Sequence, residues 1–83
     1  MTRPLSFDDF IALRYLEQQG STMTHHVART LGYERVHGGS ATRKARTLLR
    51  RLERWGYVAG ERVSLHGNVL WYAITDAGRE ALA

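Results

Sequence analysis

The side chains in this sequence with the clearest chemistry are the cations of one segment, Ser40–Arg54. Six arginine and lysine residues and one glutamate lie between Arg43 and Arg54, a net charge of +5 in a chain whose total is +4. At helical period, the apolar residues of the segment fall on one side and most cations on the other. This pattern predicts an amphipathic helix whose exposed face binds a polyanion. An ordinary solvated helix face is the alternative, because eleven of the twelve cations in the chain are arginine.

Other chemistries have little support. The chain has no cysteine, which excludes disulfides and thiolate metal sites. Of its four histidines, His25 and His26 are adjacent, and no acid stands at ligand spacing from them. We find no paired carboxylates at an obvious cleft, no nucleophile elbow and no glycine-rich phosphate loop. We therefore expect no enzyme, no metal or cofactor, and no small-molecule pocket.

Length and composition predict one small domain. The chain has 83 residues, of which 43% are hydrophobic, an ordinary share for a globular protein. No apolar run approaches the roughly 18 residues that a membrane helix needs, and the N-terminus lacks a signal-peptide core. We expect a cytoplasmic protein encoded by a bacterium, an archaeon, a phage or a plasmid.

The elements that must position the cationic segment follow from local signals. A flexible arm is expected at 1–5, and helices at 7–19, 25–31, 41–55 and 76–83. Ser6 and Asp9 form a capping-box pattern, and Gly20 supplies a stop. Thr24, Ser40 and Thr75 are the expected caps of the three later helices.

The remaining segments predict a short link, a loop and a hairpin. Ser21–Met23 is expected to be an extended link and Tyr33–Gly39 a loop. Strands at 58–64 and 69–74 form a β-hairpin over 58–74, with a tight turn near Gly67 and Asn68. The fold class is therefore α+β and mostly helical, with a three-helix core, a two-stranded hairpin and a short C-terminal helix.

Four segments together resemble a known family. Thr24–Gly32, Ala45–Leu52, Arg54–Val58 and Trp71–Arg79 are similar in order and spacing to winged helix-turn-helix DNA-binding domains of the MarR/PadR type, in a minimal single-domain form. The resemblance covers residues 10–82. The segment 33–39 is longer than the three- or four-residue turn of the family, and the additional dimerisation helices and ligand pocket of those regulators are absent from the sequence.

The resemblance implies that the helix at 41–55 enters the major groove of DNA, which is about 12 Å wide. Arg43 and Arg46 are the expected base contacts and Arg50 a phosphate contact, whereas Thr42 and Thr47 contact phosphate or a thymine methyl group. The start of the second helix and the hairpin tip supply further backbone contacts. The expected DNA-binding residues are Thr24, His25, Ser40, Thr42, Arg43, Lys44, Arg46, Thr47, Arg50, Arg62, His66 and Asn68.

Two of the cations are expected to stabilise the fold rather than to bind DNA. Arg51 and Arg54 lie near the negative end of the helix dipole, and we expect them to pair with Glu53, Glu17 or Glu80. Tyr33 is the aromatic residue expected to be most exposed, either packing under the loop or touching DNA.

We therefore predict that the protein is a transcriptional regulator that binds specific sequences of double-stranded DNA, most simply a repressor acting by occlusion. A homodimer is expected because one winged helix reads few base pairs. The candidate dimer interface combines the second apolar side of the first helix with a residue near the C-terminus. Its residues are Phe7, Ile11, Tyr15 and Leu82. The alternative is that this side of the first helix packs on the C-terminal helix of the same chain. The alternatives are a protein-interaction winged helix, an RNA- or ribosome-associated one and, as a minor option, a binder of Z-form DNA.

Overall fold

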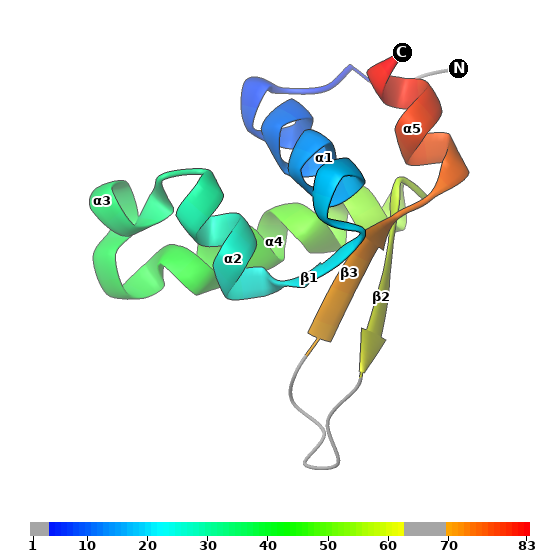
Figure 1. Cartoon of the computed structure of the whole chain (residues 1–83). Coiled ribbons are helices and arrows are strands. Elements are labelled where there is room, and N and C mark those ends of the chain that lie inside the picture. The colour runs from blue at the N-terminus through cyan, green and yellow to red at the C-terminus, as the bar shows by residue number, and fades with distance from the viewer. Residues whose placement is uncertain (1–3, 63–69) are drawn as a thin grey trace.

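The computed structural model of the chain describes residues 4–62 and 70–83, and in them helices pack on one small sheet (Figure 1). The elements in chain order are α1 (Phe7–Gln19), β1 (Ser21–Met23), α2 (Thr24–Thr30), α3 (Tyr33–His37), the 3-10 turn η1 (Gly38–Ser40), α4 (Ala41–Arg54), β2 (Val58–Arg62), β3 (Leu70–Ile74) and α5 (Asp76–Leu82). The α+β, mostly helical class is confirmed. The expected turn of the hairpin lies outside the described residues.

Helix α1 begins and ends where its sequence signals place it. The Ser6 hydroxyl accepts a hydrogen bond from the Asp9 backbone N–H, and the Asp9 carboxylate accepts one from the Ser6 N–H, each at 3.1 Å. This reciprocal arrangement satisfies two amide donors that a helix N-terminus otherwise leaves free. Gly20 ends the helix with φ 83°, a left-handed conformation that glycine adopts without steric cost.

The sheet has one strand more than the sequence predicts. Ser21–Met23, expected as an extended link, is the strand β1, and it pairs antiparallel with β3 from Ser21 opposite Ala73 to Met23 opposite Trp71. Strand β3 is central, and β2 pairs on its other side, from Val58 opposite Ile74 to Arg62 opposite Leu70. Three residues are too few to show the alternation by which a strand is recognised.

One of the predicted helix caps is wrong, and so is the predicted loop. Helix α2 begins at Thr24, with Met23 at the cap position, whereas Ser40 occupies the predicted cap position of α4; neither cap residue makes a side-chain hydrogen bond to its helix. Tyr33–His37, expected as loop, is the helix α3, which follows Gly32 at φ 74°. Such a short helix has no sequence periodicity of its own and depends on tertiary contacts. The Thr75 cap is confirmed, since its hydroxyl accepts from the Gly78 N–H at 3.1 Å.

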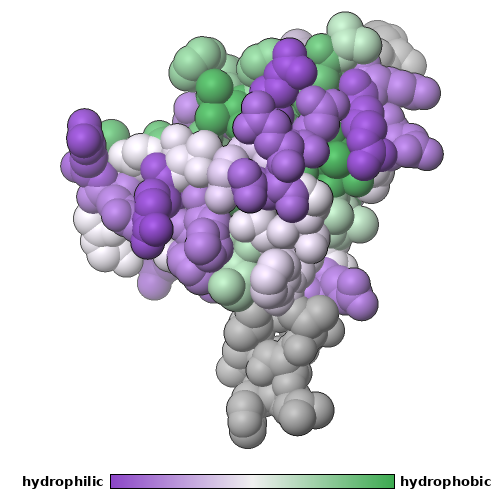
Figure 2. Space-filling view, in the orientation of Figure 1, coloured by the Kyte–Doolittle hydropathy of each residue, from purple (hydrophilic) through white to green (hydrophobic). Residues whose placement is uncertain are grey.

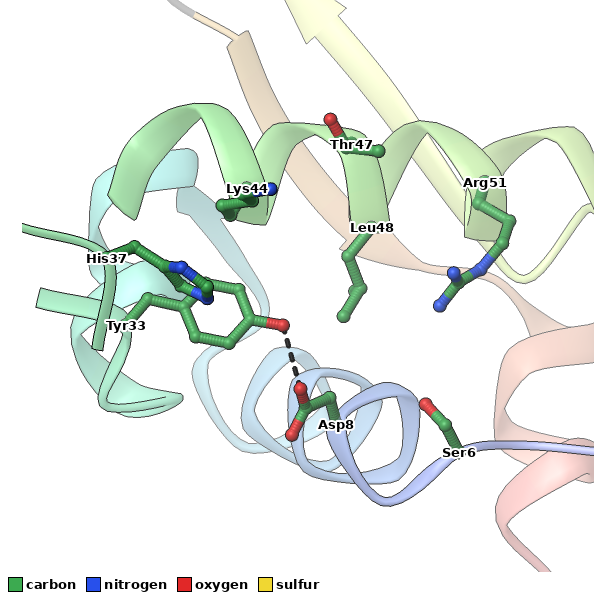
Figure 3. A pocket seen from close by; sticks show the side chains of 8 residues that line it. All are labelled: Ser6, Asp8, Tyr33, His37, Lys44, Thr47, Leu48 and Arg51. Atoms are coloured by element: carbon green, nitrogen blue, oxygen red, sulfur yellow. Dashed lines mark hydrogen bonds between the residues drawn. The ribbon is translucent and has the colours of Figure 1, made fainter. Parts of the chain in front are cut away.

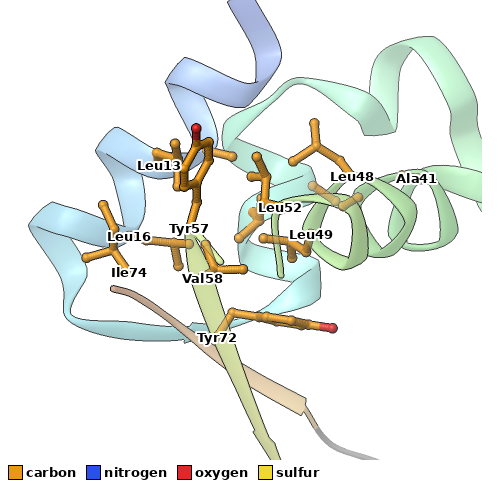
Figure 4. Packing of buried hydrophobic residues seen from close by; sticks show 14 residues of the cluster. Leu13, Leu16, Ala41, Leu48, Leu49, Leu52, Tyr57, Val58, Tyr72 and Ile74 are labelled. Carbon is orange, nitrogen blue, oxygen red and sulfur yellow. The ribbon is translucent and has the colours of Figure 1, made fainter. Parts of the chain in front are cut away.

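The core lies between α4, α1 and the sheet (Figure 4). Leu48, Leu49 and Leu52 of α4 are buried in one cluster with residues of α1, α2 and β3, among them Leu13, Leu16, Val27 and Tyr72. Burying each leucine side chain contributes about 1.5–3 kcal/mol. This packing fixes the rotation of α4 and therefore directs its opposite, cationic side outward.

Among the glycines that the structure describes, Gly78 has the least room for a side chain. A Cβ atom placed there would lie 2.3 Å from the Tyr57 carbonyl oxygen and 2.7 Å from Ile74 Cγ1. At an exposed helix position, changing glycine to alanine stabilises the folded protein by up to about 1 kcal/mol. At Gly78, by contrast, the added methyl group would force the neighbouring backbone at Tyr57 to move. We expect Gly78→Ala to destabilise by about 2 kcal/mol in urea unfolding. Gly39→Ala is the control, because nothing lies within 4 Å of its Cβ position; equal stability of the two variants would contradict this packing.

Candidate nucleic-acid interface

Helix α4 presents the predicted cations on its outer side. Arg43, Lys44, Arg46, Thr47 and Arg50 are all exposed, whereas Thr42 is half-buried. The Thr47 hydroxyl donates to the Arg43 carbonyl at 3.1 Å, so its oxygen remains available as an acceptor. Among the residues described, none of the three arginines in this group makes an ion pair. The helix thus offers guanidinium groups whose charge is not neutralised within the described part of the protein.

One flank of α4 is tied to α1 through Arg51. Its guanidinium pairs with the carboxylate of Asp9, a residue only 2% exposed, and lies over the Trp55 ring at 5.4 Å from the centroid. The structural role predicted for Arg51 is confirmed, but the predicted partners Glu53, Glu17 and Glu80 are wrong. Asp9 was not anticipated because 42 residues separate the two side chains in sequence. The capping carboxylate of one helix therefore also fixes the position of another.

The other flank of α4 faces the hairpin. The Glu53 carboxylate accepts a hydrogen bond from the Gly60 N–H of β2 at 3.1 Å. Burial raises the pKa of Tyr72 on β3, and the negative charge of Glu53 raises it further. The positive charges of Arg50 and Arg46 act in the opposite direction. Arg46 and Arg50 stand seven and three residues before Glu53, so the helical repeat places them on the same side of α4 as its contact with the hairpin.

The predicted DNA-contacting residues outside α4 differ in how exposed they are. Thr24 is only 7% exposed, so its hydroxyl is not presented to a phosphate as the sequence suggested; its position at the first residue of α2 turns it inward. His25 is exposed, with its ring 4.2 Å from that of His26, and Ser40 is exposed at the end of η1. Arg62 ends β2, but its side chain, like His66 and Asn68, lies outside the described part of the structure.

A polar hollow of about 240 Å³ lies between α1, α3 and α4 (Figure 3). This hollow could not be predicted from the sequence, because one of its walls is the unpredicted helix α3. The Tyr33 hydroxyl, from that wall, donates to Asp8 Oδ2 of α1 at 2.8 Å. The lining residues are Ser6, Asp8, Tyr33, His37, Lys44, Thr47, Leu48 and Arg51. Lys44 therefore lies on the α3 side of α4, away from the hairpin.

The phenol of Tyr33 is expected to lose its proton at a higher pH than an ordinary tyrosine. Burial, the hydrogen bond to Asp8 and the negative charges of Asp8 and Asp9 raise its pKa to about 12, against the opposing charge of Arg51. Because the pKa is higher in the folded state than in the unfolded state, the resulting stabilisation is complete below pH 10 and is lost as pH rises from about 10 to about 12. We expect Tyr33→Phe to remove one late-ionising phenol from the absorbance titration at high pH. An unchanged late phase would contradict the Tyr33–Asp8 contact.

The proposed dimer surface is only partly free. Phe7 is 77% exposed, but Ile11, Tyr15 and Leu82 are half-buried, and Tyr15 and Leu82 pack against the core of their own chain. Helix α1 packs on α5. The C-terminal helix, one of the two partners considered from sequence, is therefore a neighbour of α1, while Phe7 stays exposed.

Two kinds of feature are absent from the part of the chain that the structure describes. Residues 4–62 and 70–83 contain no group of three or more histidine, aspartate or glutamate side chains placed to hold a metal ion. None of the described helices has the length and apolar character required to cross a membrane.

Comparisons with known proteins identify the fold. No family model and no curated protein sequence matches the chain. Among solved structures, it superposes with a TM-score of 0.78 on BpsR of Bordetella bronchiseptica, whose DNA binding is regulated by 6-hydroxynicotinic acid, at 19% identity over 98% of this chain and 58% of that one.

Two further structures show the same similarity at 19% identity. The YusO protein of Bacillus subtilis gives a TM-score of 0.75 over 94% of this chain and 50% of that chain. A probable transcriptional regulator from Pseudomonas aeruginosa gives 0.72 over 94% of this chain and 53% of that chain. The chain therefore spans between half and three fifths of the length of these proteins. Their structures and this arrangement of helices and strands establish that the chain has the same winged-helix fold as these three proteins.

Proposed function

We propose that this protein binds double-stranded DNA through α4 and the hairpin and acts as a sequence-specific transcriptional regulator. The observation that carries the proposal is the exposed cationic side of α4, whose opposite side is held by Leu48, Leu49 and Leu52 in the core. A helix fits the major groove, and arginine makes two hydrogen bonds to guanine there. The similarity in fold to known regulators supports the same reading.

The roles within the interface follow from the geometry of α4. Arg43 is exposed near the start of the helix and Arg46 one turn later, which suits base contacts. Arg50 and Arg46 lie near Tyr72 at the base of the hairpin, so the hairpin and helix would hold adjacent phosphates. Arg51 has no such role, because Asp9 holds it.

The proposal also includes the kind of regulation, the cellular location and the oligomeric state. We propose repression by occlusion of a promoter, in the cytoplasm, by a two-fold dimer that doubles the number of base pairs read. Phe7, the exposed apolar residue of α1, is the residue most available for the dimer contact. Sedimentation across a wide concentration range, with and without duplex DNA, tests the dimer; a monomer under every condition would contradict it.

RNA is the second candidate, because the cationic face of α4 would also attract another polyanion. Salt dependence does not separate the two, since both nucleic acids release counterions. We therefore suggest direct competition, in which unlabelled duplex DNA or double-stranded RNA displaces a labelled DNA duplex from the protein. The proposal requires DNA to compete better. Equal or stronger competition by RNA would favour an RNA-binding winged helix, and no binding of either would favour a protein-interaction module.

A further inference from the structure

Helix α3 is a short element at the edge of the core, on which only its partly buried Tyr33 packs. None of its five residues is buried, and Val36 is 74% exposed. Fixing the backbone of each residue costs about 1–2 kcal/mol, so such a helix needs contacts that order it. In the chain, α3 comes between α2 and α4. In space, it lies beside the N-terminal end of α4, where the expected base contacts begin (Figure 1).

Two contacts to other helices hold α3 in one orientation, and one contact within α3 aligns two of its rings. The Tyr33 hydroxyl donates to Asp8 of α1 at 2.8 Å, and the Tyr33 ring meets the His37 ring edge-on at 5.0 Å between centroids. The Glu34 carboxylate lies 3.9 Å from the Arg29 guanidinium of α2. Tyr33 and His37 therefore form the side of α3 that faces the hollow and α1 (Figure 3).

This orientation determines where Arg35 lies. In an α-helix each residue is rotated by about 100° from the last, so Arg35 is about 200° from Tyr33 and faces away from α1. It is exposed and makes no ion pair with any residue of 4–62 or 70–83. The one acid of α3, Glu34, is already beside Arg29. The outward side of α3 therefore carries one positive charge, that of Arg35, which no described acid pairs with.

The cationic side of α3 is continuous with that of α4. Only the 3-10 turn Gly38–Ser40 separates the two helices, and all three of its residues are exposed. In Figure 3, α4 and α1 lie on opposite sides of the hollow and Thr47 points away from α1, so the direction away from α1 is also the outward direction of α4. Arg43 lies on that side of α4, because its carbonyl accepts the hydrogen bond of Thr47 one turn later. In the view of Figure 2, hydrophilic side chains cover much of the lobe formed by α3 and the start of α4.

We propose that α3 is a second DNA-contacting element, in which Arg35 binds a backbone phosphate beside the groove that α4 enters. The inference rests on the proposed DNA binding and adds a contact that a shorter turn between the helices could not supply. Arginine suits a phosphate because its planar guanidinium forms two parallel hydrogen bonds to it. A phosphate contact strengthens binding to every sequence and carries no base information.

The test compares Arg35→Ala with the wild-type protein on a labelled duplex of about 20 base pairs, by fluorescence anisotropy over a series of salt concentrations. We expect about five- to tenfold weaker binding, and a slope of log affinity against log salt that is shallower by about 0.9, the value of one lost phosphate contact. The loss should be the same on two unrelated duplexes. Arg79→Ala is the control, since Arg79 is an exposed arginine of α5 that pairs with Asp76 of its own helix.

The outcomes separate this inference from the proposed function. If Arg35→Ala binds with wild-type affinity and slope while Arg43→Ala binds weakly, α3 lies outside the interface and only the inference fails. A loss confined to one duplex sequence would also overturn the phosphate contact. If the wild-type protein binds no duplex, the proposed function itself fails. Circular dichroism of each variant confirms that the change has not unfolded the protein.

Discussion

Replacing Arg43 and Arg46 together by glutamate is expected to abolish specific binding to duplex DNA. Both side chains are exposed on the outer side of α4, and neither pairs with an acid among the described residues. Each arginine contact to a base contributes about 1–3 kcal/mol, so losing two weakens binding by at least about thirtyfold. Glutamate adds repulsion from the phosphates, which removes the remaining attraction.

A control with the same change in net charge makes this result interpretable. Arg14 on α1 and Arg79 on α5 are exposed and pair only with acids of their own helices, Glu17 and Asp76. The double variant Arg14→Glu, Arg79→Glu should retain most of its affinity and the same sequence preference. Equal loss in both double variants would mean that overall charge, rather than the face of α4, attracts DNA. Retained binding after the change in α4 would place the interface elsewhere.

Asp9→Ala is expected to give the largest loss of stability among the polar substitutions considered. The buried carboxylate accepts from the Ser6 N–H at the start of α1 and pairs with Arg51 of α4. Loss of a capping interaction costs about 1 kcal/mol, and a hydrogen bond to a charged group about 1.5–3 kcal/mol. We therefore expect a decrease of about 3 kcal/mol in the free energy of unfolding, which in a domain of this size lowers the melting temperature by on the order of 15 °C.

The two roles of Asp9 can be measured separately. Asp9→Asn retains an oxygen that can cap α1 but loses the charge that faces Arg51, so its stability should be intermediate. A double-mutant cycle of Asp9→Asn with Arg51→Met then isolates the interaction between the helices. Urea unfolding of the four proteins provides the values. A loss below about 0.5 kcal/mol for Asp9→Ala would place it in the range of ordinary surface substitutions and contradict this role.

The sequence predicts well those features that depend on neighbouring residues. The periodicity of α4 places Leu48, Leu49 and Leu52 inside and the arginines outside, because fourteen residues give several turns of one pattern. The Ser6 and Asp9 capping pattern is equally local, and the structure confirms it. The first of these signals is enough to identify the helix that carries the candidate site.

Features that depend on contacts between distant segments could not be predicted in the same way. Helix α3 has five residues and is positioned by Asp8 of α1, and strand β1 has three residues and is defined by its pairing with β3. Arg51 has acids near it in sequence, yet its partner is Asp9. In each case the deciding contact is tertiary, and a short segment carries no periodic signal to indicate it.

These tertiary contacts also change the interpretation of the site. Arg51 is held by Asp9, Lys44 lies on the flank beside α3, and Arg46 and Arg50 lie on the flank beside Tyr72. The cations of one helix therefore have three different surroundings. We still propose Arg43 and Arg46 for the base contacts, and the proposed contact from α3 is one that the sequence did not suggest.

The central claim is that α4 reads the sequence of double-stranded DNA, and selection from a random duplex library tests it most directly. The full chain is used to retain duplexes containing a random segment of about 25 base pairs, long enough for two half-sites one helical turn apart. We predict an enriched palindromic consensus rich in guanine at the positions contacted by arginine, and its loss when Arg43 and Arg46 are replaced. Retention of DNA without any enriched sequence, or no retention at all, would contradict the claim.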